Sequence, residues 1–329
     1  MLKIDMHTHT SCPDVEPLVA GRYDPQANPY KRDMSAESKA TDAGRPALYK
    51  PKLSDPTVRL ADMARMRVDF QIIAPAPAQQ HYWADEELLL AVSRVQNDHV
   101  AGFASRDPKH FAAVGTLPMR FPKLAADEAA RGVLELGLKG FQIDTRVNEQ
   151  ELSDPAFDPV WAKLAELGVP LLLHPLGFSH GQRLSPFFMV NSVGQPLEEL
   201  IAAMHLISGG VLDRYPDLKV VIAHGGGYLP FYVGRLDHAW KVRPEVKALT
   251  PEPPSAYLRR MWFDTCVFRA DHIATLVELA GVDRIMLGSD YPFDMGDEDP
   301  VATVEACGGL DEAARDAILG GNAKALFGL

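Results

Sequence analysis

Two histidines, His7 and His9, stand one residue apart at the end of the first short apolar run, MLKIDMHTHT. In a β-strand alternate side chains point to the same face, so both imidazoles would lie on one side of this strand and Leu2, Ile4 and Met6 on the other. Two imidazoles so close together can bind one metal ion. An isolated pair of this kind also occurs as plain polar residues where a strand meets a loop, so donors elsewhere in the chain must decide.

Three further donor residues end other strand-like runs. LLLHP reaches His174, VVIAHGGG reaches His224, and IMLGSD ends in Asp290. His7, His9, His174 and Asp290 would form a set of three imidazoles and one carboxylate, which leaves coordination positions open for water and substrate, as catalytic metal sites do. These residues predict a site for one divalent ion. Zinc is the first expectation, and manganese, cobalt or iron suit the same donors.

A bound divalent ion lowers the pKa of its water from about 15.7 to roughly 7, so the predicted chemistry includes proton transfer at neutral pH. We interpret His224 as the general acid–base group beside the metal, and expect Asp290 to share the proton transfer. Three glycines follow His224 and let backbone or ligand approach closely. A tight turn from strand to helix is the other interpretation of HGGG, and it stays open at this point.

The elements that must position these groups are eight strand-like runs that alternate with helix-like segments. The runs cover residues 2–7, 69–75, 112–118, 139–144, 169–174, 219–224, 260–265 and 284–290. This alternation predicts an α/β fold, a (β/α)8 TIM barrel, in which functional groups sit at the C-terminal ends of parallel strands. A doubly wound sheet is the alternative, but no GxGxxG follows the first strand.

We expect residues 1–329 to form a single domain, with residues 10–55 as an insertion over the mouth of the barrel. This segment is rich in Pro, Gly, Asp, Ser and Lys, and it is longer than most connections in compact domains. It leaves the C-terminal end of the first strand. A second excursion, residues 177–196, follows the fifth strand and should reach the same mouth.

Composition and charge exclude several classes of protein. Hydrophobic residues make up 47% of the chain and charged residues 23%, an ordinary globular composition. The net charge of -11, without a basic stripe, argues against a nucleic-acid partner, although a few cations in one pocket can still bind an anionic substrate. No run approaches membrane-spanning length, so we expect no membrane partner. Three scattered cysteines without a CxxC indicate a reducing, cytoplasmic location.

Several phrases resemble the amidohydrolase superfamily and, within it, the metal-dependent decarboxylases similar to 2-amino-3-carboxymuconate-6-semialdehyde decarboxylase. They are IDMHTHT, GTLPM, LLLHP, VVIAHGGGYLPFYVGRLDH and IMLGSDYPFD, and the similarity runs almost from end to end. The resemblance implies that His7, His9, His174 and Asp290 are the metal ligands and that His224 is the catalytic histidine. It also implies that the binuclear members' carbamylated lysine is absent, because the fourth strand ends in QID, so a single metal is expected.

The resemblance implies non-oxidative decarboxylation of an unsaturated or aromatic carboxylic acid, similar to a carboxymuconate semialdehyde or a hydroxybenzoate. The substrate would then be a small anionic carboxylate. A metal-dependent hydrolase or hydratase, acting on a lactone, amide or conjugated acid, is the alternative, because nearly the same ligands would serve it. A metal-binding barrel without activity is a third interpretation, which His224 and Asp290 argue against.

The resemblance also implies a homodimer, because Arg235 matches an arginine that reaches the substrate from the neighbouring subunit. A guanidinium is well suited to binding a carboxylate. Two positions depart from the family pattern: Ala47 replaces a second substrate-binding arginine, with Arg45 nearby but out of register, and Asn191 replaces an aromatic residue. These departures predict a different acid substrate. The candidate substrate-binding residues are Arg235, Arg45, Asn191, Trp83 and Phe293.

Overall fold

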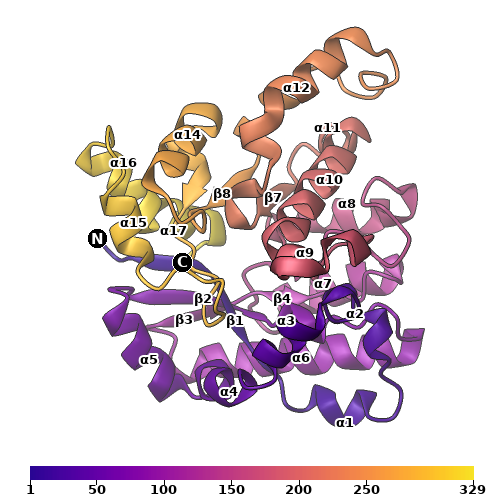
Figure 1. The fold of residues 1–329 in the computed structure, drawn as a ribbon, viewed down its shortest axis with the longest axis vertical. Helices are drawn as coiled ribbons and strands as arrows, with labels where there is room; N and C mark the ends of the chain where they lie inside the picture. Colours follow the sequence, from indigo (N-terminus) through magenta and orange to yellow (C-terminus); the bar gives the residue numbers. More distant parts are fainter.

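The computed structural model describes residues 1–329 and shows parallel strands surrounded by helices (Figure 1). The strands are β1 (Ile4–Thr10), β2 (Phe70–Pro75), β3 (Phe111–Ala113), β4 (Gly115–Thr116), β5 (Phe141–Ile143), β6 (Pro170–Leu173), β7 (Lys219–Ile222), β8 (Trp262–Asp264) and β9 (Ile285–Met286). Each of the eight predicted runs overlaps a strand, although β1 extends beyond its run to Thr10. The third run holds two short strands, β3 and β4, separated by Val114, and the positions of all eight are confirmed.

Hydrogen bonds close these strands into a barrel. The strands pair in parallel in the orders β1-β2-β3 and β4-β5-β6-β7-β8-β9. The Val114 amide donates to Ile73 O at 2.9 Å and joins the two sheets. On the other side, the Met6 amide donates to Leu287 O and the Asp290 amide to His7 O, each at 2.9 Å. The predicted (β/α)8 fold is therefore confirmed, and the doubly wound alternative is wrong.

Helices cover the outside of the barrel, and most begin at a capping aspartate or a proline. The covering helices are α5 (Pro56–Arg65), α6 (Glu86–Arg106), α7 (Pro122–Leu134), α8 (Asp158–Leu167), α10 (Gly194–Ser208), α11 (Val211–Arg214), α12 (Leu229–Val242), α13 (Pro254–Tyr257), α14 (Ala270–Ala280), α15 (Pro300–Glu305), α16 (Glu312–Asp316) and α17 (Asn322–Phe327). In α6, for example, the Asp85 side chain accepts from the Leu88 amide at 3.0 Å. None of the helices is long and apolar enough to cross a membrane.

Two apolar clusters divide the core. The larger has 58 buried residues and fills the space between strands and helices. The smaller has 14, among them Ile72, Leu172, Val221 and Met286, which come from different strands and fill the barrel interior. Apolar side chains thus fill the lower part of the barrel, below the C-terminal ends of the strands.

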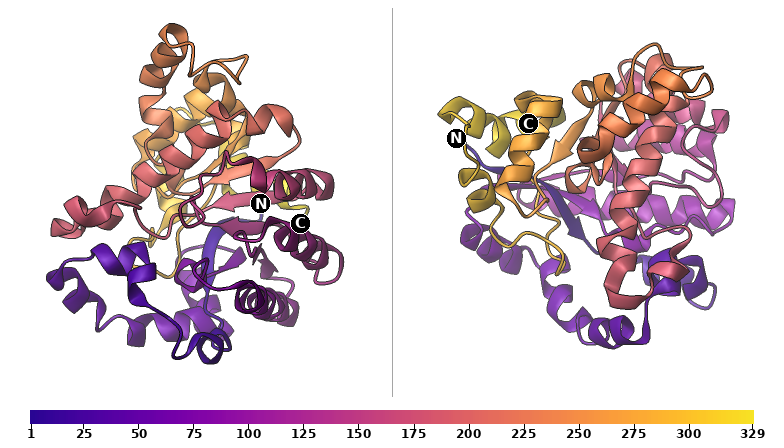
Figure 2. Two further views of the ribbon diagram at one scale, coloured as in Figure 1. Left: turned by 90° about the vertical axis from the view of Figure 1, so that its right-hand side faces the viewer. Right: turned by 45° about the horizontal axis from the view of Figure 1, so that its top comes forward.

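The segment between β1 and α5 contains four short helices, α1 (Val15–Val19), α2 (Pro29–Asp33), α3 (Ala36–Asp42) and α4 (Pro46–Ser54). They lie together along one side of the molecule (Figures 1 and 2). The segment after β6 contains α9 (Met189–Ser192) and touches the first one, because Arg32 donates to Ser179 O at 3.0 Å and the Gly181 amide to Asp33 at 3.1 Å. The two excursions are therefore joined.

Candidate active site and metal centre

Three histidines and one aspartate from three separate parts of the chain meet at the C-terminal end of the barrel. His7 and His9 belong to β1, His174 follows β6, and Asp290 follows β9. All four are buried, and their donor atoms lie within 4.8 Å of one another. Asp290 Oδ1 lies 3.0 Å from His9 Nε2, 3.4 Å from His7 Nε2 and 3.6 Å from His174 Nε2. The residues predicted as metal ligands are thus brought together.

A bulge in β1 brings both histidines into the barrel. Strict alternation would place Ile4 and Met6 on the face opposite His7 and His9, and this expectation is wrong. Ile4 and Met6 belong to the interior cluster, yet the two imidazoles also reach the interior group around His174. The register of β1 against β2 shifts between Asp5 and Thr8. One extra residue in the strand reverses the alternation, so the residues after it change sides.

The donor atoms fit a divalent cation. The Nε2 atoms of His7 and His174 are buried and have no hydrogen-bond partner, whereas buried polar atoms are normally paired. Burial lowers the pKa of His9 and of His174 to about 4, so these imidazoles are neutral and each keeps a lone pair. Neutral imidazoles and a carboxylate are the forms that coordinate metal. The cluster can therefore hold one divalent ion.

A second carboxylate orients His7 and the turn that follows β7. Asp264, the last residue of β8, lies 2.6 Å from His7 Nδ1, which places the proton on Nδ1 and leaves Nε2 free for a metal. Asp264 also accepts from the amides of His224 at 3.1 Å and Gly225 at 2.9 Å. Burial raises the pKa of Asp264, but the hydrogen bond from His7 and the nearby imidazoles outweigh it, and the pKa lies below its ordinary value.

His224 lies between two carboxylates. Its Nδ1 is 2.6 Å from Glu199 Oε1 on α10, and its Nε2 is 3.6 Å from Asp290 Oδ2. Burial lowers the pKa of His224, but Glu199 and Asp290 outweigh this effect and raise the pKa well above its ordinary value. Burial raises the pKa of Glu199 to about 7. At neutral pH a proton is therefore held within the His224–Glu199 pair.

The backbone at this site is strained. His224 has φ 50° and Asp290 has φ 61°, a left-handed conformation that non-glycine residues adopt rarely and mostly at functional sites. Gly225, which follows His224, must be a glycine for two reasons. Its φ is 62°, and a Cβ at this position would lie only 2.3 Å from Val267 Cγ1. The HGGG segment is therefore a tight turn, and this turn presents the imidazole to the site.

A cavity of about 640 Å³ opens beside His174 and Asp290. Residues of the segment between β1 and α5, of the loop after β6 and of the loop after β9 line it. Three of the predicted substrate-binding residues, Arg45, Asn191 and Phe293, are among them. The Phe293 ring lies 5.3 Å from the His9 ring, so it forms an apolar wall next to the four candidate metal ligands.

Arg45 lies in this cavity, but its charge is already paired. Its guanidinium forms an ion pair with Asp294, lies 3.7 Å from Asp42 and donates to the Tyr49 hydroxyl at 3.0 Å. Two lysines that the sequence analysis did not single out, Lys31 and Lys39, also line the cavity, and neither forms an ion pair within the chain. These lysines are the unpaired cations of the cavity.

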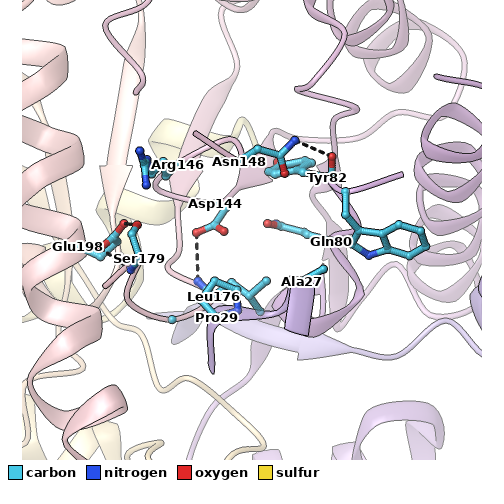
Figure 3. A pocket seen from close by; sticks show the side chains of 12 residues that line it. Ala27, Pro29, Gln80, Tyr82, Asp144, Arg146, Asn148, Leu176, Ser179 and Glu198 are labelled. Atoms are coloured by element: carbon cyan, nitrogen blue, oxygen red, sulfur yellow. Dashed lines mark hydrogen bonds between the residues drawn. The ribbon is translucent and has the colours of Figure 1, made fainter. Parts of the chain in front are cut away.

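Trp83 and Arg235 do not lie in this cavity. Trp83 lines a separate, small cavity of about 70 Å³, whose polar groups Gln80, Tyr82 and Asp144 appear in Figure 3. The Trp83 Nε1 atom lies 3.2 Å from His81 Nδ1. Arg235 lies on α12, exposed and without an ion-pair partner in the chain. Within a single chain, therefore, neither Trp83 nor Arg235 lies next to the four candidate metal ligands.

Asp264 and Glu199 contact the candidate site residues His7 and His224, and the sequence analysis missed both. Asp264 is the last residue of β8 and the last but one of the seventh strand-like run, so the same reasoning that selected His174 and Asp290 could have found it. Glu199 comes from a helix, and nothing in PLEEL distinguishes it from an ordinary exposed glutamate.

The strand expected to lack a metal-bridging lysine is β5. Its Gln142 side chain donates to Pro75 O at 3.0 Å. Lys139 lies at the opposite end of this strand, where its Nζ donates to Gly328 O.

The chain matches the Amidohydrolase family over residues 4–329 and belongs to it. It is 36% identical over 276 residues to 2-amino-3-carboxymuconate-6-semialdehyde decarboxylase of Dictyostelium discoideum, which covers 84% of this chain and 77% of the relative. The resemblance seen in the sequence is thus confirmed.

Two solved structures share the fold. One is 5-carboxyvanillate decarboxylase from Sphingomonas paucimobilis, with a TM-score of 0.87 and 26% identity over 100% of this chain and 99% of that one. The other is a dihydroxybenzoic acid decarboxylase from Polaromonas sp. JS666, solved with manganese and the inhibitor 2-nitroresorcinol, with a TM-score of 0.81 and 24% identity over 100% and 97%. All three of these proteins are decarboxylases.

Proposed function

We propose that this protein is a metal-dependent, non-oxidative decarboxylase, a carbon–carbon lyase, of a small unsaturated or aromatic carboxylic acid. The observation that carries the proposal is the cluster of His7, His9, His174 and Asp290, with proton-bearing His224 beside it, at the edge of a cavity large enough for such an acid. The relatives that act on carboxymuconate and carboxyvanillate support this class of substrate.

The four clustered residues would hold one divalent ion. When bound, the ion acts as a Lewis acid that orients and polarises substrate oxygens. Zinc suits the donor set and is our first proposal. Manganese is the alternative, supported by the manganese bound in the Polaromonas enzyme. Elemental analysis of protein purified without chelator decides between these ions, and a metal content well below one ion per chain would contradict the site.

The reaction replaces a carboxylate by hydrogen: the bond to the carboxyl carbon breaks, CO₂ leaves, and one proton is added to the substrate carbon. His224 holds a proton between Glu199 and Asp290, and Asp290 lines the cavity. We assign the proton transfer to His224 Nε2 together with Asp290 Oδ2, and we assign to Glu199 the role of keeping His224 protonated. Because Glu199 is fully buried, proton exchange between the His224–Glu199 pair and bulk water is limited.

The cavity offers both charge and apolar surface to the substrate. Lys31 and Lys39 supply positive charge for a carboxylate, and the Phe293 ring supplies a wall for an unsaturated or aromatic skeleton. Arg45 would fix the position of Asp294 in the cavity wall through their ion pair, and Asn191, which lines the cavity, would hydrogen-bond polar substituents of the substrate. The segment of residues 10–55 would act as part of a single domain and cover the cavity.

We further propose a homodimer in which Arg235 reaches the partner's site. Helix α12 stands away from the barrel (Figures 1 and 2), and it presents apolar side chains to solvent: Phe231 is 40% exposed, Tyr232 57% and Val242 53%. Exposed apolar area of this kind is typical of an interface. Mixing Arg235→Ala with His224→Ala should restore activity in mixed dimers, because one site then has both residues. No recovery, or a monomer in light scattering, would contradict this arrangement.

We place the protein in the cytoplasm, because its three cysteines are free and buried, which fits a reducing compartment.

The decisive test incubates metal-loaded protein with carboxylated muconate semialdehydes, dihydroxybenzoates and lactones, and measures CO₂. We expect CO₂ from at least one acid, lost in His224→Ala and retained in His110→Ala, since His110 pairs with Asp107 just before β3, at the opposite end of the strands from the site. Addition of water without CO₂ would instead establish a hydrolase or hydratase on the same scaffold.

A further inference from the structure

A second group of metal-ligating side chains lies outside the site described above. Cys12 and Asp14, at the start of the segment that follows β1, meet His99 of α6, and the three donor atoms lie within 4.8 Å of one another. These residues come from parts of the chain more than eighty positions apart, so the fold and not local sequence brings them together. We propose that Cys12, Asp14 and His99 form a second metal site, for zinc or a similar borderline-soft divalent ion.

The groups at this site are prepared for a cation. The Cys12 side chain is buried, and burial together with the Asp14 charge raises the pKa of its thiol, although the backbone N–H groups of Asp14 and Val15 oppose this rise. The sulfur is therefore a thiol in the metal-free protein, and a bound cation would supply the positive charge that stabilises its thiolate. His99 Nε2 is buried and has no hydrogen-bond partner. Asp14 stands at the N-terminus of α1, yet its carboxylate caps no helical amide and is free to act as a ligand.

The backbone around Cys12 is held in place. The Cys12 amide donates to Gln79 Oε1 at 2.9 Å, and Gln79 Nε2 donates to Cys12 O at 2.8 Å. Gln96 of α6 in turn donates to Gln79 O at 3.0 Å. The thiol also lies 3.8 Å from Val95 O, one helical turn before His99. The sulfur and the imidazole therefore have a fixed relative position, and only the exposed Asp14 side chain must adjust.

The donor set selects the class of ion. Ligands at about 2.0–2.3 Å from a tetrahedral zinc ion are roughly 3.3–3.8 Å apart, so a small movement from the present spacing suffices. A thiolate, an imidazole and a carboxylate suit zinc or cobalt and disfavour magnesium, calcium and manganese, which prefer oxygen ligands. Binding displaces the thiol proton to solvent. The bound ion would tie α1, the first helix of the inserted segment, to α6.

Cobalt provides a direct test. Protein stripped with chelator and loaded with Co²⁺ should bind two ions per chain and show a thiolate-to-cobalt charge-transfer absorption in the near ultraviolet. The His7–His9–His174–Asp290 cluster contains no sulfur, so this absorption reports the second site. His9→Ala should lose one ion and keep the absorption, which separates the result from any failure of the proposed decarboxylase site.

Cys12→Ser and His99→Gln should each lose the absorption and one ion while CO₂ release persists. Cys307→Ser and Cys266→Ser are the matched controls, because both cysteines are buried and free, and both variants should keep the absorption. His99→Gln keeps Cys12 intact and covers the case in which Cys12→Ser does not fold. One ion per chain without the absorption, or an absorption that persists in Cys12→Ser, would overturn the proposal.

Discussion

The Nδ1 atom of His224 lies 2.6 Å from Oε1 of Glu199, a carboxylate carried by a helix and not by a barrel strand. Glu199 is fully buried and the His224 side chain is 15% exposed, and Glu199 Oε2 has no hydrogen-bond partner. Glu199 therefore serves a single partner, and its charge is directed at the imidazole. This pairing makes Glu199 a positioning residue for the proton that His224 carries.

Glu199→Gln should lower kcat by roughly 100-fold, because the amide cannot stabilise the imidazolium by charge. The Glu199 carboxylate raises the pKa of His224, so its loss lowers that pKa and should move the alkaline limb of the kcat profile to lower pH. KM should change little. Steady-state rates between pH 5 and 9 measure both effects. Glu278→Gln, on the exposed face of α14, is the control, and an unshifted alkaline limb in Glu199→Gln would contradict the role.

Removal of the metal should destabilise the folded protein. An ion that binds only the folded chain adds about 2.7 kcal/mol when its concentration is 100 times its Kd. Thermal unfolding with and without chelator measures this difference. His9→Ala should lose the part of the metal-dependent increase that comes from this cluster, because His9 is one of its four donors, and should keep the part that comes from an ion at Cys12, Asp14 and His99. If His9→Ala gained as much from added metal as the wild type, the cluster would not be the main binding site.

Lys31→Ala and Lys39→Ala should each raise KM by roughly 10-fold and leave kcat nearly unchanged, because each removes a charged hydrogen bond to the substrate carboxylate. Both lysines line the cavity without an ion-pair partner. Lys163→Ala is the matched control, since Lys163 is paired with Glu166 at 2.6 Å on α8. Equal KM values for all three variants would place the carboxylate elsewhere.

Asp144→Asn should make stability less dependent on pH. Burial raises the pKa of Asp144 from 3.8 to about 7 in the folded state. Between these values the unfolded chain releases a proton that the folded chain keeps, so the stability of the wild type falls as pH rises from about 4 to 7. The variant should gain up to about 4 kcal/mol relative to the wild type from pH 4 to pH 8, because each pKa unit corresponds to about 1.4 kcal/mol.

Urea denaturation across this pH range measures the effect of Asp144→Asn. The amide oxygen can still accept from the Leu176 amide, which the carboxylate binds at 3.1 Å. Asp217→Asn changes an exposed aspartate and should follow the wild type at every pH. A constant difference between Asp144→Asn and the wild type would show that Asp144 ionises normally.

Gly288→Ala should impair both stability and activity. A Cβ at this position would lie 2.7 Å from Asp264 Cβ and 3.0 Å from His7 Cβ, so the added methyl group would displace the pair that orients a metal ligand. We expect a loss of about 1–3 kcal/mol in the free energy of unfolding and weaker metal binding. Gly308→Ala, where a Cβ meets nothing within 4 Å, is the control. Normal metal affinity in Gly288→Ala would show that the site tolerates the shift.

The amino-acid sequence by itself determined the barrel and the rim of donors. Eight apolar runs separated by amphipathic segments allow few other folds, and parallel strands in a barrel bring their C-terminal ends together. His174 and Asp290 could therefore be associated with His7 and His9 although they lie far apart in the chain. The same logic extends to Asp264, which also ends a strand.

Only the tertiary structure decided which groups touch those donors. The bulge in β1 that turns His7 and His9 inward depends on pairing with β2, and it leaves no mark on a pattern of alternating residues. Glu199 faces His224 because α10 packs against the turn after β7, a matter of helix orientation. Arg45 is neutralised by Asp294 through space. Such contacts depend on distances between elements, which local propensity and periodicity do not encode.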